Sequence, residues 1–220
     1  MTSRAFQDRL LKRARKAGCS VSPAVAGQLE EYFSLLARWN AKINLTAFNL
    51  RDPRDEAFDR LLIEPAVAAQ HLPQHSVSVI DIGSGSGSPA IPLRLAAPQS
   101  RLTMVEAKTR KAVFLLEALR HLGIGDASVE TARFEQLLTR PELHEAFDVM
   151  TIRAVRVEST TLVTLQAFLR PGGLLFWFQG ASRELQPDLL VFPLVLSRVV
   201  PLVEESGSRL VILSKQSPSR

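Results

Sequence analysis

The sequence predicts an α/β fold: a mostly parallel sheet, a helical extension at the N-terminus and an antiparallel hairpin at the C-terminus. Three observations predict it. Short apolar runs alternate with helical periodicity between residues 77 and 178, whereas residues 1–40 carry helical patterns alone. Two further apolar runs near the C-terminus flank a short polar segment. Repeated alternation of strand and helix is typical of a parallel sheet with helices on both faces.

The N-terminal segment has the pattern of a basic amphipathic helix. Residues 1–20 hold six basic side chains and one acid, Asp8, and apolar residues recur at near-helical spacing. Two interpretations are open: the helix packs on the domain with its charges in solvent, or it is an arm that contacts phosphates. Continuity with the next helix disfavours a third, a mitochondrial transit peptide. Ser22 and Pro23 start that next helix as N-cap and first-turn proline, and its apolar face runs to Trp39.

The alternating region supplies the sheet. Pro171 and the two glycines after it predict a turn into the fifth strand. We divide the chain into a helical extension, residues 1–60, and a single compact domain, residues 61–220. The expected strands span residues 77–82, 102–105, 128–130, 147–152 and 174–178, the hairpin 199–203 and 209–213, and the helices 91–97, 109–122, 134–138 and 159–169.

Composition limits the class of protein. The chain has 220 residues, of which 46% are hydrophobic, enough for one globular core. A net charge of +5 favours a polyanionic partner. Cys19 is the single cysteine, which excludes an intrachain disulfide and a cysteine-rich zinc site. The spacing of the four histidines fits no metal motif, so we expect no metal.

Targeting patterns are missing from the sequence. The N-terminus lacks the apolar core and cleavage site of a secretory signal, and no uninterrupted apolar run reaches the roughly 18 residues of a membrane span. The most apolar stretch, residues 189–203, is interrupted by two prolines, a serine and an arginine. We expect a cytoplasmic monomer without a membrane partner.

The strongest motif is a glycine-rich loop that ends the first expected strand. Glycines let the backbone turn tightly and approach a ligand, and ligands of open α/β sheets bind at the carboxyl ends of the strands. Ser88 stands where the dinucleotide fingerprint has its third glycine, and the loop lacks the lysine of a Walker motif. Asp81, two positions before Gly83, is typical of enzymes that use S-adenosylmethionine. The loop reads Asp81-Ile82-Gly83-Ser84-Gly85-Ser86-Gly87.

A second element is Glu106, which follows the second expected strand 25 positions after Asp81. A carboxylate there can accept hydrogen bonds from both ribose hydroxyls of a nucleoside ligand. The alternative is a surface glutamate that caps the next helix, because anions favour helix N-termini. The glycine loop in the right place favours the ribose role.

Five segments together identify a family. They read Trp-Asn-Ala-Lys-Ile-Asn-Leu-Thr-Ala at 39–47, the glycine loop continued through Pro-Ala-Ile-Pro-Leu at 89–93, Phe-Leu-Leu-Glu at 114–117, Arg-Phe-Glu at 133–135 and Arg-Ala-Val at 153–155. In this order the chain resembles the RsmG (GidB) methyltransferases, which modify N7 of a guanosine in small-subunit ribosomal RNA. The resemblance covers residues 25–180 and implies a class I, Rossmann-like methyltransferase that uses S-adenosylmethionine.

The resemblance also implies site residues. Phe134 would pack on adenine, unless it is an ordinary core residue. Arg153 would be the positioning residue at the end of the fourth strand and would contact the methionine carboxylate or an RNA phosphate, since a guanidinium matches either. Its alternative is a salt bridge to an internal acid such as Asp81 or Glu135. The expected cofactor-binding residues are Gly83, Ser84, Gly85, Gly87, Ser88, Glu106, Phe134, Glu135 and Arg153.

Contacts to RNA are expected from basic and polar residues around the same cleft. Phosphate contacts give affinity, while exposed bases are read by stacking on aromatic rings. Aromatic residues make up only 6% of the chain, so we expect recognition of a folded RNA or of the small ribosomal subunit. The expected RNA-binding residues are Lys42, Asn44, Lys108, Arg110, Lys111 and Arg156.

The chain departs from the family pattern on the substrate side. It has Leu61-Leu62-Ile63-Glu64-Pro65 where the family usually has His-Leu-Leu-Asp-Ser, and Gln179 where the family usually has lysine. Guanine N7 carries a lone pair and no proton, so its methylation needs alignment and no strong base or metal. Rival functions are a methyltransferase on another RNA or a small molecule, or a non-catalytic relative that binds the ribosome.

Overall fold

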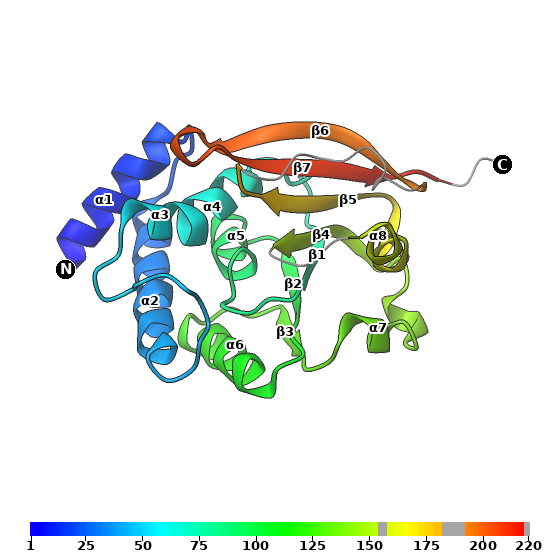
Figure 1. Ribbon diagram of the computed structural model, residues 1–220, viewed down its shortest axis with the longest axis horizontal. Helices are drawn as coiled ribbons and strands as arrows, with labels where there is room; N and C mark the ends of the chain where they lie inside the picture. The colour runs from blue at the N-terminus through cyan, green and yellow to red at the C-terminus, as the bar shows by residue number, and fades with distance from the viewer. Residues whose placement is uncertain (154–157, 182–191, 218–220) are drawn as a thin grey trace.

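A seven-stranded sheet forms the centre of the computed structural model, which describes residues 1–153, 158–181 and 192–217. The strand order is β3-β2-β1-β4-β5-β7-β6 (Figure 1). The first five strands pair in parallel, and β7 is antiparallel to both β5 and β6. The predicted α/β fold with its C-terminal hairpin is therefore confirmed. The strands are β1 (Ser78–Ile82), β2 (Arg101–Val105), β3 (Ala127–Glu130), β4 (Phe147–Arg153), β5 (Leu169–Gln179), β6 (Leu194–Val203) and β7 (Ser208–Lys215).

Helices cover both faces of the sheet (Figure 1). Helices α2, α5 and α6 lie on one face, and α7 and α8 lie on the other. Alternate strand residues supply the two cores: Val79 and Val149 face the first layer, and Ile80 and Met150 face the second. The helices are α1 (Ser3–Lys16), α2 (Pro23–Asn40), α3 (Asp55–Phe58), α4 (Glu64–Ala69), α5 (Ala90–Ala96), α6 (Thr109–His121), α7 (Phe134–Leu137) and α8 (Ser159–Leu165).

The start of β5 differs from expectation. The strand begins at Leu169 and runs through the Pro-Gly-Gly segment that predicted a turn. The pairing register with β4 shifts between Phe147 and Val149, so the expected turn is an irregularity within the strand. A side chain at Gly173 would place its Cβ 2.8 Å from the carbonyl oxygen of Arg170, which explains a glycine there.

A helical segment at residues 55–69 was not expected. It consists of α3, one π-helical turn (η1, Asp59–Ile63) and α4, and it continues through residue 60. The departures from the family pattern at Leu61 and Pro65 lie in this segment, and both residues are buried. The division of the chain at residue 60 stays a prediction.

Helix α1 packs on this segment and on α2. Thr2 caps its first turn, and its apolar stripe of Phe6, Leu10 and Ala14 is buried. The ring of Phe6 lies 5.4 Å from that of Phe33 and 4.9 Å from that of Phe58. Aromatic contacts at these centroid distances add to the free energy of burial. The N-terminal helix therefore belongs to the hydrophobic core.

Candidate functional site

The glycine loop connects β1 to α5 at the carboxyl edge of the sheet. The N–H groups of Gly83 and Ser84 both donate to the carbonyl of Val105, at 2.9 and 3.0 Å, which fastens the loop to β2. Three of its glycines have positive φ, 75°, 51° and 83°, a region that side chains rarely adopt. At Gly87 a Cβ would also lie 2.7 Å from Ile91 Cδ1. The positive φ angles thus explain why every second residue from 83 to 87 is glycine.

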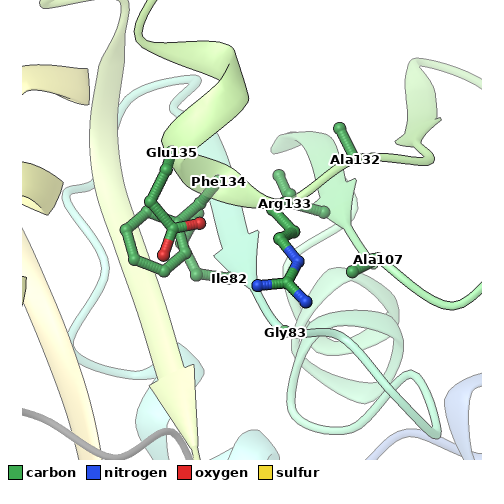
Figure 2. Close-up of a pocket in the computed structure, with 8 residues that line it drawn as sticks. Ile82, Gly83, Ala107, Ala132, Arg133, Phe134 and Glu135 are labelled. Atoms are coloured by element: carbon green, nitrogen blue, oxygen red, sulfur yellow. The ribbon is translucent and has the colours of Figure 1, made fainter.

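A pocket of about 290 Å³ opens beside this loop (Figure 2). The ends of β1 and β2 and the turn before α7 line it, and most of the lining is apolar. Three expected cofactor residues meet here: Gly83, Phe134 and Glu135. The expected residues Ser84, Gly85, Gly87, Ser88, Glu106 and Arg153 are not among the lining residues, which are Ile82, Gly83, Val105, Ala107, Ala132, Arg133, Phe134 and Glu135.

Glu106 is buried behind the loop. One carboxylate oxygen accepts from the N–H of Gly85 at 2.9 Å, and the other accepts from the N–H of Lys108 at 2.8 Å, at the start of α6. The helix-capping alternative therefore describes half of its contacts. Each oxygen keeps a further lone pair, so the ribose role stays compatible with this geometry.

Asp81 is buried beneath the loop and incompletely bonded. Thr151 donates its hydroxyl to one carboxylate oxygen at 2.5 Å. The other oxygen has no hydrogen-bond partner among the described residues. Burial raises the pKa of the Asp81 carboxyl above its ordinary value. A buried acceptor without a partner is unusual in a folded protein and makes Asp81 a candidate site residue, although it does not line the pocket.

Arg153 has an internal acidic partner, and it is neither of those expected. Its guanidinium pairs with Glu64 at 2.9 Å and also donates to the carbonyl of Arg60. It lies 4.4 Å from the centroid of the Phe178 ring, and burial lowers its pKa to about 10. Sequence reasoning missed Glu64 because the two residues are 89 positions apart. The alternative of a salt bridge to an internal acid describes this contact, with Glu64 as the acid in place of the two named examples, Asp81 and Glu135.

Ser88 joins the loop to the same ionic cluster. Its hydroxyl donates to the carbonyl of Leu61 at 2.9 Å, and a nitrogen of Arg153 lies 3.4 Å from its oxygen. The side chain of Glu64 is fully buried and also accepts from Arg60 at 3.1 Å. Residues 60–64 and the glycine loop are therefore held together by Arg153 and Ser88, on the side of the sheet away from the pocket.

Most of the expected RNA-binding residues face solvent. Lys42, Asn44, Lys108 and Arg110 are exposed, and Lys111 is half-buried close to Gly85. The ring contact between Trp39 and Phe114, 5.9 Å between centroids, brings the end of α2 against α6. Arg156 lies outside the described residues.

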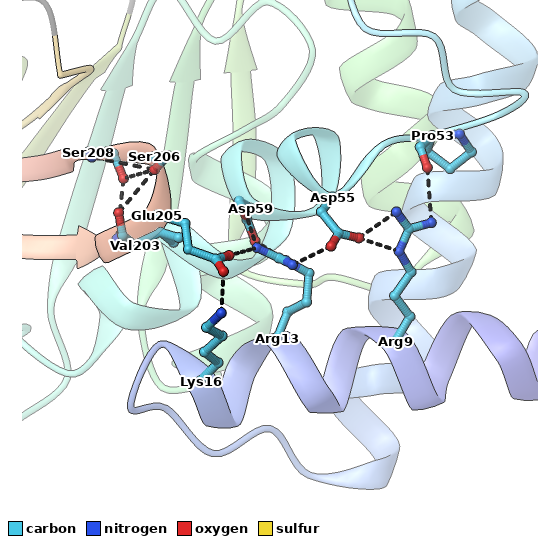
Figure 3. Close-up of polar contacts among 10 residues, drawn as sticks. All are labelled: Arg9, Arg13, Lys16, Pro53, Asp55, Asp59, Val203, Glu205, Ser206 and Ser208. Carbon is cyan, nitrogen blue, oxygen red and sulfur yellow. Dashed lines mark hydrogen bonds and ion pairs between the residues drawn. The ribbon is translucent and has the colours of Figure 1, made fainter.

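The basic side chains of α1 are largely paired within the protein (Figure 3). Arg9 contacts Asp55 at 2.5 Å, and Arg13 contacts Asp55, Asp59 and Glu205 at 2.5 to 2.8 Å. Lys16 also pairs with Glu205. These contacts favour the packed helix over the phosphate-binding arm for this face of α1.

Two further residues bear on the site. Arg133, which was not assigned a role from the sequence, lines the pocket and points across it (Figure 2). Gln179 ends β5 and is buried, with its side-chain oxygen accepting from Arg209 at 3.1 Å. Its side-chain nitrogen has no partner among the described residues.

Neither a cluster of three metal-binding side chains nor a membrane-spanning helix occurs in the described ranges.

Comparison with known proteins decides the family. The model of the rRNA small subunit methyltransferase G family matches residues 26–198. The chain belongs to this family. The resemblance noted from the sequence is confirmed, and with it the enzyme class, an S-adenosylmethionine-dependent methyltransferase. Helix α1 lies before the matched range.

Relatives carry the same family name. "Ribosomal RNA small subunit methyltransferase G" of Xanthomonas euvesicatoria is 38% identical over 165 residues, 73% of this chain and 72% of that protein. The protein of that name from Stenotrophomonas maltophilia strain K279a is 36% identical, over 74% of this chain and 73% of its own length.

Solved structures share the fold of this methyltransferase G family member. A SAM-dependent methyltransferase from Aquifex aeolicus aligns with a TM-score of 0.56 at 12% identity, over 74% of this chain and 94% of that one. A 16S rRNA (adenine(1408)-N(1))-methyltransferase from Catenulisporales acidiphilia aligns with a TM-score of 0.53 at 17% identity, over 73% and 94%. The Rossmann-like architecture is thereby confirmed.

Proposed function

We propose that this protein transfers the methyl group of S-adenosylmethionine to N7 of a guanosine in small-subunit ribosomal RNA, as a cytoplasmic monomer. The observation that carries the proposal is the pocket at the end of β1 and β2, beside a glycine loop with Glu106 behind it. The family membership supports the same chemistry. The ribosomal RNA or the small subunit is the partner.

The pocket and the buried acids next to it fit the cofactor. Its apolar lining suits the adenine ring, Glu106 suits the ribose hydroxyls, and the unbonded oxygen of Asp81 suits a cationic group. Gly83 and Gly85 present backbone close to a ligand without side chains in the way. When bound, the cofactor supplies an electrophilic methyl group.

The chain's own contribution to the reaction is alignment. Guanine N7 attacks through its lone pair, so no side chain has to remove a proton. The buried cluster of Arg153, Glu64 and Ser88 fixes the segment at residues 60–64 against the loop. Lys42, Asn44, Lys108, Arg110 and Lys111, together with Arg156, would hold the RNA through its phosphates. Arg153 is here a positioning residue, because its contacts with Ser88 and with the carbonyl of residue 60 hold the glycine loop in place.

The cofactor site is tested by a matched pair of glycine variants. Gly85→Val and Gly123→Val replace glycines at φ 51° and 62°, and neither Cβ would meet an atom closer than 3.6 Å. The backbone strain is thus similar, but only Gly85 is in the loop. Calorimetry should show loss of S-adenosylmethionine binding for Gly85→Val alone. Equal affinity in both folded variants would refute the loop as the cofactor site.

The substrate is tested by mapping methylated nucleotides. Ribosomal RNA from cells with and without the gene is digested and compared by mass, with a Gly85→Val complement as the inactive control. We expect one guanosine methylation in the small-subunit RNA to depend on the intact gene. The ribosomal assignment would be overturned if methylation is lost in another RNA instead, or if no methylation is lost.

A second candidate function is methylation of a different RNA. It is favoured by two departures on the substrate side, Leu61 and Gln179, which replace a histidine and a lysine of the usual pattern. Gln179 changes the charge at the carboxyl end of β5, where parallel-sheet enzymes place substrate contacts. The same mass mapping separates the two candidates.

A further inference from the structure

Arg133 is an unpaired cation at the mouth of the pocket. It follows β3, directly precedes α7 and is exposed. It forms no ion pair with any described residue. Figure 2 shows its side chain extending toward Gly83 and Ala107, which also line the pocket. A guanidinium is weakly hydrated, so in this position it is free to contact a ligand bound in the pocket.

Nearby acids in the described ranges do not pair with this guanidinium. Glu130 already accepts from Arg140 at 2.8 Å. Both oxygens of Glu106 accept backbone N–H groups. Glu135 also lines the pocket, but it forms no ion pair with Arg133. The partner of Arg133 is therefore to be sought in the ligand.

The side chains around the guanidinium indicate which part of a ligand would lie next to it. The lining beneath it is apolar, with Ile82, Val105, Ala132 and Phe134, and suits a flat uncharged ring. A guanidinium is itself planar and stacks on aromatic faces, with cation–π attraction as the added term. A ring held between these apolar side chains and Arg133 would be covered on both faces.

We propose that Arg133 stacks its guanidinium on the adenine ring of S-adenosylmethionine and closes the pocket over it. This inference rests on the proposed cofactor site and assigns a binding residue to it. The arrangement explains why Arg133 has no acidic partner and why it extends inward from an exposed turn. It also gives a cation to a site whose ligand ring is neutral, so the contact costs no charge repulsion with the ring.

The test compares two ligands. Calorimetry uses S-adenosylmethionine and 5′-methylthioadenosine, which keeps the adenine and ribose and lacks the amino acid group. Arg133→Ala should weaken both ligands by the same factor, roughly 5- to 20-fold. Arg133→Lys should recover only part of this, because an ammonium is not planar. Arg120→Ala, an exposed arginine outside the pocket and outside the expected RNA-binding residues, is the matched control and should leave both affinities unchanged.

The alternatives give different results. Weaker binding of S-adenosylmethionine alone would mean a carboxylate contact and would overturn the proposal. Unchanged affinity for both ligands, with a higher KM for RNA and a smaller salt slope, would mean a phosphate contact and would overturn it too. Failure of the wild-type protein to bind either ligand would instead refute the proposed function. Arg133→Gln, which keeps a planar group without charge, serves if Arg133→Ala does not fold.

Discussion

Basic side chains have acidic partners at the helical segment of residues 55–69 but, within the described ranges, have none at the rim of the pocket. In the segment, Asp55, Asp59 and Glu64 each pair with arginines. At the rim and the start of α6, Arg133, Lys108 and Arg110 have no acidic partner among the described residues. Positive charge is therefore a structural element in the first region and is available to a ligand in the second. The number of basic residues alone does not distinguish these uses.

The largest effect is expected from Glu64→Ala. The substitution leaves Arg153 buried without its acid, and removing one partner of a buried pair costs about 3–5 kcal/mol. The free energy of unfolding, measured with urea, should fall by that amount. Glu135→Ala, at the exposed rim, is the control and should change it by less than about 0.5 kcal/mol. A similar small change for Glu64→Ala would contradict the structural role.

A smaller loss is expected from Arg13→Ala. Arg13 and Asp59 are nearly buried, but Asp55 and Glu205 are about half exposed. The loss in unfolding free energy should be about 1–3 kcal/mol, between the ranges for exposed and buried pairs. The affinity for RNA should keep its salt dependence, because this charge is already neutralised. A reduced salt slope would show that α1 contacts phosphates after all.

For the basic residues at the rim and the start of α6 we expect the opposite: little change in stability and a change in RNA binding. Replacing Lys108, Arg110 and Lys111 together by alanine should change the unfolding free energy by less than about 0.5 kcal/mol. Each phosphate contact that is lost should lower the salt slope of RNA binding by roughly one. Titrations at several salt concentrations measure it. An unchanged slope in the triple variant would remove this patch from the RNA interface.

The smallest effect is a pH dependence at Asp81. Its folded-state pKa is raised by burial, so it favours folding below its unfolded pKa, and this contribution is lost as pH rises through the folded pKa. Asp81→Asn removes the titration. The stability of the variant relative to wild type should therefore rise as pH increases from the unfolded value near 3.8. Urea denaturation across this range measures it, and a relative gain that grows toward acid would contradict the assignment.

The strands could be predicted from the sequence because each carries its own pattern. The expected strand at residues 147–152 and the observed β4 differ by one residue, and β1 and β2 agree as closely. Apolar runs of this length bounded by glycine or charge are local features. The start of β5 could not be predicted, since a Pro-Gly-Gly sequence normally marks a turn and only pairing with β4 keeps it in the strand.

The site could be predicted in part. Gly83, Phe134 and Glu135 line the pocket because they follow strands whose ends meet at one sheet edge. The partner of Arg153 could not be predicted, because Glu64 comes from a helical segment whose sequence shows no clear helical periodicity. Arg133 was missed for another reason: an arginine between two apolar residues looks like any surface charge until its direction is known.

The pairing of α1 with the turn after β6 has a consequence for biosynthesis. Arg13 and Glu205 are separated by 192 residues, so the first helix leaves the ribosome long before its last partner is made. At translation rates of 5–20 residues per second the interval is about 10–40 s. During that time the apolar side of α1 can settle on α2, but its arginine stays partly uncompensated. The ion pairs of α1 are therefore complete only after the segment at residue 205 has been synthesised.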